Sequence, residues 1–252
     1  MGSIEANGLL KEFDGLRAVD EVTFEVRKGE IFGFLGPNGA GKNTTIRTLL
    51  GFLKPTRGTA RIFGESIEDD LLGIKERVGY IPGDLNLYKD MTGEEFLDYF
   101  QSLRGSDSPL LDPLLERFEI PLDRDIGGFS RGMAQKLAII QAFMHDPELI
   151  VMDEPTSGLD PLMQQEFYEF LEQEKDRGRT LFFSSHILSE VEKMCDRVAI
   201  IREGKLVTLE GMDSLKRKMG KIVRLRIKED WEEFDVSEEV EIEDGWGRFV
   251  FR

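Results

Sequence analysis

Cysteine, histidine and long apolar segments are scarce in this chain of 252 residues, which has one Cys and two His. The single thiol, Cys195, excludes a disulfide within the chain and a metal site built from several cysteines, as is typical of a reducing compartment. A membrane-spanning helix needs about 20 consecutive apolar residues, whereas the apolar runs here, such as residues 149–152, have the length of a strand. The first residues also lack the apolar core of a signal peptide. We therefore expect a cytoplasmic protein with no membrane span of its own.

Positive charge is the other deficit. The chain has 33 Lys and Arg against 49 Asp and Glu, which gives a formal net charge of -16. Proteins that bind DNA or RNA neutralise phosphates with Lys and Arg, so we expect no nucleic acid partner. The content of hydrophobic residues, 40%, is that of a folded globular protein. A chain of this length can form one large α/β domain, with or without a small appendage.

Apolar strands alternate with helical patterns through most of the chain. The strands are expected at residues 31–35, 59–63, 78–81, 149–152, 180–183 and 198–201. Helical periodicity is present at residues 44–50, 92–103, 110–118, 132–144 and 162–174. Thr92 and Glu95 form a capping-box pattern at the start of the second of these helices. The alternation predicts a mostly parallel sheet that is covered by helices on both faces.

The two ends of the chain have β patterns of another kind. Residues 22–26 alternate at period two before a turn, which predicts an N-terminal antiparallel β subdomain. Near the C-terminus, two alternating segments flank a densely acidic stretch at residues 229–244. We expect a main domain over residues 1–215 and a small C-terminal β appendage over residues 216–252. Because the alternating, strand-like pattern continues to Arg252, one interpretation is that the appendage is truncated.

The strongest local signal is a glycine-rich loop between the strand at 31–35 and the helical pattern that begins at Thr44. Its residues are Gly36, Pro37, Asn38, Gly39, Ala40, Gly41 and Lys42. Glycines allow backbone N–H groups to face an anion, and the helix N-terminus adds the positive end of its dipole. Lys42 supplies a point charge for β and γ phosphates. The spacing predicts a phosphate-binding loop.

A second signal is the apolar strand at 149–152, which ends in Asp153 and Glu154. Ligand and catalytic groups of open α/β sheets lie at the carboxyl ends of the strands. In this interpretation Asp153 holds Mg²⁺, directly or through water, and Glu154 acts as the general base toward the attacking water. An apolar strand that ends in Asp-Glu is common, so this signal depends on the motifs around it.

Two further motifs flank this strand. Residues 129–135 (FSRGMAQ) precede it and residues 155–160 (PTSGLD) follow it. Together with the phosphate loop, this order resembles the ABC ATPases over about residues 4–210. The resemblance implies a P-loop NTPase cassette with a helical signature subdomain over about residues 84–145. It also implies ATP and Mg²⁺ as cofactors, and ATP hydrolysis as the activity.

The resemblance assigns roles to single residues. Ser130 and Gly132 match the signature residues that cap the γ-phosphate of ATP on the opposite subunit, which implies a head-to-tail homodimer, or a pair with a paralogous cassette. His186 matches the switch histidine that contacts the γ-phosphate. Asp160 matches the D-loop residue that couples the two sites, and Phe13 lies where the family stacks an aromatic ring on adenine.

Two departures from the family pattern concern the metal. Asn43 replaces the Ser or Thr hydroxyl that ligates Mg²⁺, and Gly83, followed by Asp84, replaces the Q-loop glutamine. A carboxamide oxygen lies about 1.2 Å further from the backbone than a hydroxyl, and Mg²⁺ demands near-ideal octahedral geometry. Thr44, also a phosphate-loop residue, points about 100° away around the helix and does not substitute. We expect weaker metal binding and impaired hydrolysis, whether Asn43 is natural or introduced.

A third departure is Arg131, which stands where the signature often has glycine and whose role the sequence leaves open. Arginine is suited to phosphate or to a facing carboxylate.

The resemblance implies an ATP-binding and hydrolysing subunit, peripheral on the inner face of the membrane, that drives a separate integral membrane permease docked over residues 85–103. Residues 80–84 and the short β tail look most like ABC-2 type exporters, including drug-efflux members. Two alternatives stay open. One is a soluble ABC ATPase that acts on a partner outside transport, and the other is a nucleotide-binding scaffold whose hydrolysis is impaired by Asn43.

Overall fold

The computed structural model describes residues 2–105, 107–218, 221–225, 240–243 and 246–251. The chain divides into two compact units, Met1–Leu209 and Glu210–Arg252. Each unit is described by itself. Among the described residues, no helix combines the length and the apolar character that a membrane span requires.

The centre of the first unit is a six-stranded sheet of order β10-β9-β3-β8-β7-β6. Its strands are β3 (Ile31–Leu35), β6 (Val78–Ile81), β7 (Leu149–Asp153), β8 (Thr180–Ser185), β9 (Arg197–Arg202) and β10 (Lys205–Gly211). The pairs β3/β8, β3/β9, β7/β8 and β6/β7 are parallel. Every residue of β3, β7 and β8 is buried, which explains their continuous apolar runs. The register places Asp153 opposite Ser184, so polar residues meet at the carboxyl edge.

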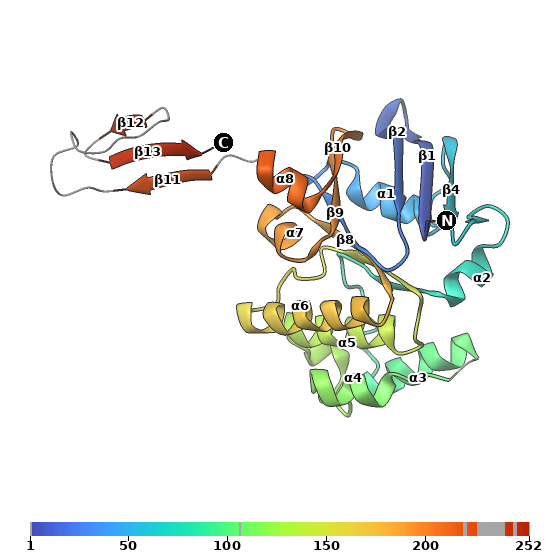
Figure 1. Ribbon diagram of the computed structural model, residues 1–252. Helices are drawn as coiled ribbons and strands as arrows, with labels where there is room; N and C mark the ends of the chain where they lie inside the picture. Colours follow the sequence, from blue (N-terminus) through green and yellow to red (C-terminus); the bar gives the residue numbers. More distant parts are fainter. Residues whose placement is uncertain (1, 106, 219–220, 226–239, 244–245, 252) are drawn as a thin grey trace. The chain divides into compact units, whose positions relative to one another are not determined.

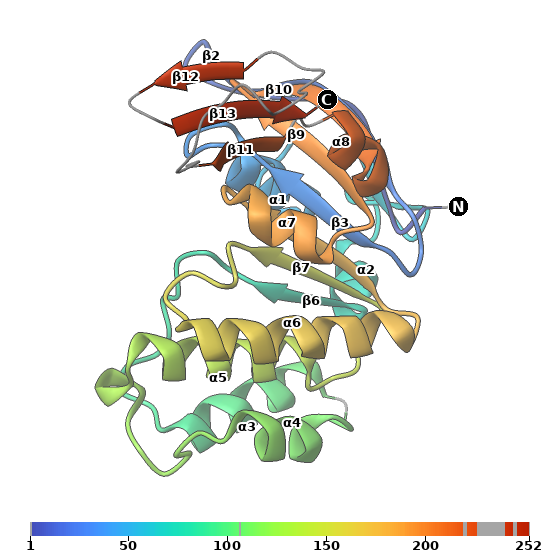
Figure 2. The ribbon, with the colours of Figure 1, turned by 60° about the vertical axis from the view of Figure 1, so that its left-hand side comes forward.

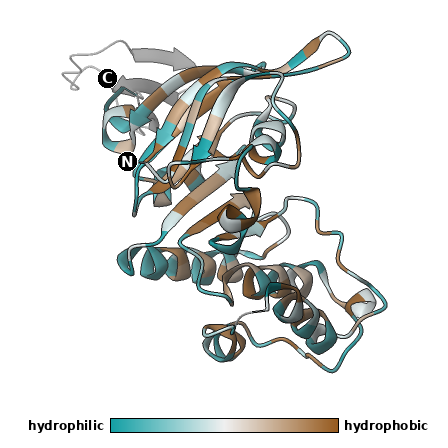
Figure 3. Cartoon of the chain, turned by 90° about the vertical axis from the view of Figure 1, so that its right-hand side faces the viewer, coloured by the Kyte–Doolittle hydropathy of each residue, from teal (hydrophilic) through white to brown (hydrophobic). Residues whose placement is uncertain are grey.

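A second, antiparallel sheet lies beside the first unit's central sheet (Figure 1). It has the order β2-β1-β4-β5, with β1 at Ile4–Phe13, β2 at Leu16–Val26, β4 at Arg57–Ile62 and β5 at Glu65–Ser66. Hydrophobic and hydrophilic bands alternate along its strands (Figure 3). Its inward residues form one core with Phe32, Phe34 and Phe182 of the parallel sheet. Phe24 stacks on Phe32 at 5.6 Å between ring centroids.

Seven α-helices are described in the first unit. They are α1 (Lys42–Leu49), α2 (Leu71–Glu76), α3 (Gly93–Arg104), α4 (Leu111–Phe118), α5 (Arg131–Phe143), α6 (Pro161–Asp176) and α7 (Leu188–Met194). Helices α5 and α6 lie beneath strands β6 and β7, with α3 and α4 beyond them (Figure 2). The expected capping box is present, because the Thr92 side chain accepts from Glu95 N and the Glu95 side chain accepts from Thr92 N.

The expected strands and long helices agree with the observed ones to within about three residues at each end, and the α/β fold with its mostly parallel sheet is confirmed. One strand was placed slightly wrongly. Phe63 was expected in the strand that the structure ends at Ile62. Its φ of 55° lies in the left-handed region, outside regular β geometry.

The second unit begins within β10 and continues as α8 (Met212–Lys218). It includes a three-stranded sheet of order β11-β13-β12, formed by β11 (Lys221–Leu225), β12 (Val240–Glu243) and β13 (Trp246–Phe251). Both pairings are antiparallel. Most of the acidic stretch expected at residues 229–244 lies outside the described residues.

Candidate functional site

The glycine-rich loop joins the end of β3 to the start of α1, as expected. Gly39 has φ 79° and Gly41 has φ 105°, both in the left-handed region that favours glycine. A Cβ at position 41 would lie 2.4 Å from the Ala18 carbonyl oxygen, so the loop also passes too close to its neighbour for a side chain. Helix α1 therefore begins directly at Lys42, with its first N–H groups at the mouth of the loop.

Lys42 is buried, and its ammonium is held within the loop. The Nζ atom donates to the carbonyl oxygens of Gly36 at 2.7 Å and Pro37 at 3.3 Å. It also forms an ion pair with Glu154 Oε1 at 3.2 Å. The cation of the phosphate loop and the expected general base thus share one contact.

The two carboxylates at the end of β7 have different surroundings. Asp153 is buried, and burial, together with the nearby charge of Glu154, raises the pKa of its carboxyl, although a hydrogen bond from Ser184 and the charge of Lys42 oppose the rise. Ser184 Oγ donates to Asp153 Oδ1. Glu154 is partly exposed and has φ 48°, so its side chain leaves the strand direction. Its Oε2 atom lies 3.2 Å from His186 Nδ1.

A buried carboxylate holds these segments from behind. Glu190 of α7 accepts from Thr156 Oγ1 at 2.7 Å and from Ser185 Oγ at 2.5 Å. Thr156 lies in the loop after β7, and Ser185 ends β8 where the next loop begins. One side chain therefore binds both loops at their base. Glu154 and His186 project from these two loops, so their 3.2 Å contact is supported by the fold.

Lys42, Asp153 and Glu154 line a cavity of about 340 Å³ at the carboxyl edge of the sheet, which we call the carboxyl-edge cavity. It is lined by Ala18, Asn38, Gly39, Gly41, Lys42, Asn43, Thr44, Gly83, Asp84, Arg131, Asp153, Glu154 and Ser157. Among the described parts of the chain, no group of three or more His, Cys, Asp or Glu side chains has the geometry of a metal site. The Asp153 carboxylate suits Mg²⁺ only as one ligand among others, which ATP oxygens would supply.

Other expected site residues lie outside this cavity. Ser130 is the N-cap of α5 and accepts from Met133 N at 3.2 Å. It lines a neighbouring cavity of about 400 Å³, and Gly132 follows it in the first turn. Asp160 caps α6 by accepting from the N–H groups of Leu162 and Met163. Phe13, at the end of β1, is 42% exposed.

Two serines have roles that the sequence pattern did not indicate. Ser184 fixes Asp153, and Ser157 lines the carboxyl-edge cavity, where it also accepts from Arg131. A pair of polar residues, Ser184 and Ser185, at the end of an apolar strand was the available signal.

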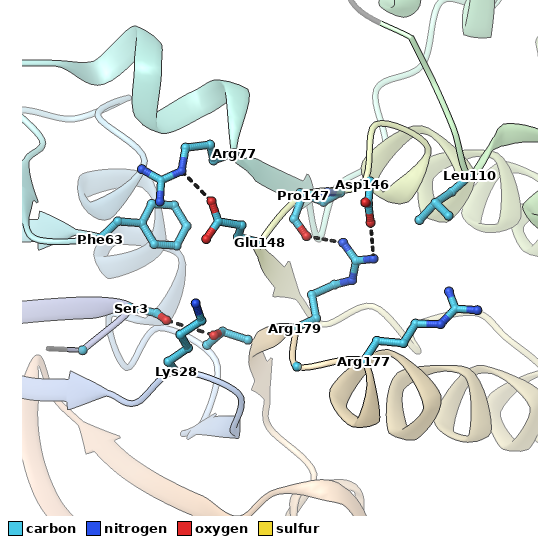
Figure 4. A pocket seen from close by; sticks show the side chains of 13 residues that line it. Ser3, Lys28, Phe63, Arg77, Leu110, Asp146, Pro147, Glu148, Arg177 and Arg179 are labelled. Atoms are coloured by element: carbon cyan, nitrogen blue, oxygen red, sulfur yellow. Dashed lines mark hydrogen bonds and ion pairs between the residues drawn. The ribbon is translucent and has the colours of Figure 1, made fainter.

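A larger cavity, of about 770 Å³, lies at the opposite, amino edge of the sheet (Figure 4). We call it the amino-edge cavity. Its arginines are already paired: Arg77 Nε with Glu148 at 2.7 Å, and Arg179 Nη2 with Asp146 at 2.6 Å. The Arg77 guanidinium also covers the Phe63 ring at 4.0 Å. Volume alone therefore does not identify the site.

Comparison with known proteins gives a consistent result. Residues 19–157 match the family model described as ABC transporter. The bacitracin transport ATP-binding protein BcrA of Bacillus licheniformis is 39% identical over 90% of this chain and 75% of its own length. The ABC transporter ATP-binding protein NatA of Bacillus subtilis is 39% identical over 79% of this chain and 84% of its own length.

Solved structures agree in fold. A structure described as the ATP binding subunit of an ABC transporter has 32% identity and a TM-score of 0.79, and the match covers 85% of this chain and 92% of that one. A nucleotide-free ATP-binding cassette at 24% identity has a TM-score of 0.75 over 86% of this chain and 94% of its own, which shows the likeness of fold alone.

Proposed function

This chain belongs to the family of ABC transporter ATP-binding proteins, and from that premise we propose that it hydrolyses ATP in the carboxyl-edge cavity to drive a separate membrane permease. The observation that carries the proposal is the linked contact of Lys42, Glu154 and His186 beside the phosphate loop. The three groups needed to bind a terminal phosphate, to activate water and to orient the base thus lie together.

The geometry supports a sequence of events. A polyphosphate carries more negative charge than one carboxylate, so its arrival draws Lys42 away from Glu154 Oε1. The released carboxylate accepts a proton from the attacking water, while His186 keeps it oriented. Asp153 would hold Mg²⁺ against the ATP oxygens, and the metal would stabilise negative charge in the transition state. Asn43 lines this cavity where the family supplies a hydroxyl ligand, so we infer slower hydrolysis.

A head-to-tail dimer, with a second copy or a paralogous cassette, is the proposed working form. Ser130 is exposed at the N-terminus of α5, a helix of 13 residues, where the dipole favours an anion. Gly132 and Asp160 follow at helix starts that also remain accessible. The exposed ring of Phe13 suits stacking on adenine.

The permease is proposed to dock on a groove of about 480 Å³ within the first unit. Its lining is rich in aromatic residues, including Phe52, Tyr88 and Phe96. Phe52 is 49% exposed and Tyr88 is 51% exposed, although both are large and apolar. The groove overlaps the expected segment 85–103. Names of relatives that refer to bacitracin and multidrug transport favour an exporter, placed on the inner face of the membrane.

The experiment is co-expression with the protein encoded by the adjacent reading frame, which we expect to span the membrane. We expect the two to purify together from detergent, and Phe52→Glu with Tyr88→Glu to abolish this without changing ATP binding. Association that survives both substitutions would exclude this groove. A soluble partner in place of a membrane protein would favour the alternative, an ABC ATPase that acts outside transport.

A further inference from the structure

The groove proposed for the permease, which we call the docking groove, has an unusual balance of charge. Among the described residues that line it, Lys75 and Arg104 are cations, and none is Asp or Glu. The chain as a whole has the opposite balance, because 49 of its 252 residues are acidic and 33 are Lys or Arg. The docking groove is therefore a positively charged site on a strongly negative protein.

The two cations belong to different helices, Lys75 to α2 and Arg104 to the end of α3. Arg104 Nη1 donates to the carbonyl oxygens of Lys75 and Glu76, both at the long distance of 3.4 Å. The Lys75 ammonium lies 4.8 Å from the centre of the Phe52 ring. In the part of the chain that the structure describes, neither cation forms an ion pair with a carboxylate.

Both cations are half-buried before any partner arrives. Burial lowers the pKa of the Arg104 guanidinium, although the charge of Glu76 opposes the fall. The group has thus lost part of its hydration without gaining a carboxylate. A protein surface that covers the docking groove would remove more water from Arg104 and Lys75. Because a buried charge without a partner of opposite sign is strongly unfavourable, the covering surface must supply one.

The rest of the lining narrows the chemistry of the covering segment. Aromatic rings, among them Phe52, Tyr88 and Phe96, offer contact area to apolar side chains. The planar guanidinium of Arg104 matches a carboxylate, which accepts two parallel hydrogen bonds from it. The docking groove therefore suits a segment that presents apolar side chains together with a carboxylate.

We propose that the permease segment in the docking groove carries an Asp or Glu side chain that pairs with Arg104 and Lys75. The proposal rests on the proposed function, because it requires a permease in this groove, and it names the chemistry of the segment that binds there. The aromatic rings would supply contact area, and the charged pair would fix the register of the segment and exclude permeases with a basic residue at that position.

The test is the affinity of the purified chain for the protein encoded by the adjacent reading frame, solubilised in detergent and measured without nucleotide. Arg104→Met should weaken binding by a factor on the order of thirty, and Lys75→Met by about tenfold, because each leaves the partner's carboxylate short of a cation. Arg124→Met and Lys54→Met, on exposed residues outside the docking groove, are the matched controls. Unchanged ATP binding and urea denaturation show that each variant is folded.

Exchange of charge identifies the partner's residue. Arg104→Glu should abolish binding, because it places a like charge against the carboxylate. Each Asp and Glu in the cytoplasmic segments of the partner is then replaced by Lys in turn, and one replacement should restore binding to Arg104→Glu. If no replacement restores it, the cations bind backbone carbonyls or lipid phosphates, and the proposal is wrong. Affinities of Arg104→Met and Lys75→Met that equal those of the controls would also overturn it.

Failure of the proposed function gives a different result. Absence of binding by the unaltered chain, or binding that survives Phe52→Glu with Tyr88→Glu, would refute docking in this groove. If that pair of substitutions abolishes binding while Arg104→Met and Lys75→Met do not weaken it, the groove is occupied and only the charged pair is refuted.

Discussion

The two edges of the central sheet both combine cations with carboxylates, but they combine them differently. At the amino edge, Arg179 and Arg77 have carboxylate partners that are fixed by burial or by several contacts. At the carboxyl edge, Lys42 shares Glu154 with His186, and Arg131 has a neutral partner. The first arrangement stabilises the fold, whereas we propose that the second exchanges its partners for a phosphate. In this proposal, exchangeable charge, and not volume, distinguishes the functional edge.

The largest expected effect is on ATP turnover, and it should distinguish the two glutamates that flank β7, one at each edge of the sheet. Glu154→Gln removes the general base and should lower ATP turnover roughly a thousandfold, while ATP still binds. Glu148→Gln, at the other end of the strand, should leave turnover unchanged. Steady-state phosphate release measures both.

In a background with Asn43→Ser, Glu154→Gln should also trap an ATP-bound dimer in size-exclusion chromatography, and a persistent monomer would contradict the proposed dimer.

Substitutions at the amino edge should change the free energy of unfolding and leave ATP turnover unchanged. Arg179 and Glu174 have side chains that are 7% and 2% exposed, and their atoms Nε and Oε2 lie 2.6 Å apart. Arg179→Met leaves this buried carboxylate with the exposed Arg177 as its remaining ion-pair partner and should cost about 3 kcal/mol of unfolding free energy. Arg77→Met, in exposed pairs, should cost less than about 1 kcal/mol. Urea denaturation measures the difference, and equal costs would show that the burial of Arg179 has no special effect.

Asn43 allows a test within the carboxyl edge, in which ATP turnover is compared before and after its replacement by serine. If its misplaced oxygen removes about 3 kcal/mol of transition-state stabilisation, turnover falls on the order of a hundredfold. Asn43→Ser should restore that factor at saturating Mg²⁺ and ATP, with a much smaller change in nucleotide affinity, because Lys42 and the loop amides are unaltered. Asn86→Ser, outside this cavity, is the control. Equal turnover before and after Asn43→Ser would show that the loop accommodates the carboxamide.

The smallest effect concerns His145, which directly precedes Asp146 of the amino-edge cavity. Burial lowers its pKa to about 4, and the charges of Arg104 and Arg179 lower it further, whereas a backbone hydrogen bond with Val78 and the charge of Asp146 oppose the fall. The unfolded chain takes up a proton near the ordinary pKa of about 6.5, whereas the folded chain does not, so stability falls as the pH drops from 6.5 toward 4. His145→Gln should reduce this loss by about 2 kcal/mol. Parallel stability profiles in urea from pH 7.5 to 4.5 would contradict the assignment.

The sequence predicted those features that depend on residues close together in the chain. The glycine-rich loop between a strand and a helix was identifiable because the three segments are consecutive at residues 31–50, while its role in phosphate binding stays a prediction. The strand at 78–81 and the capping box at Thr92 were found for the same reason, since period and cap lie within one short window. Roles carried over by resemblance, such as those of Phe13 and Asp160, stay predictions.

Long-range contacts were beyond sequence reasoning. The hydrogen bond from Ser184 to Asp153 depends on the register of β7 against β8. The reach of Arg131 to Ser157 depends on how the helical subdomain packs against the sheet. Helix α2 has six residues, too few to show a helical period. The amino-edge cavity is formed by segments far apart in the chain, none of which has a motif.

Each edge has one lysine in its cavity, which allows a direct test of the central claim. Titration of ATP against Lys42→Gln and Lys28→Gln compares the same charge change at the carboxyl and amino edges. The account predicts that Lys42→Gln weakens ATP binding by a factor on the order of a hundred, as expected for a lost charged contact to phosphate, while Lys28→Gln leaves it unchanged. Loss of binding in Lys28→Gln with retention in Lys42→Gln would place the nucleotide at the amino edge and contradict the account.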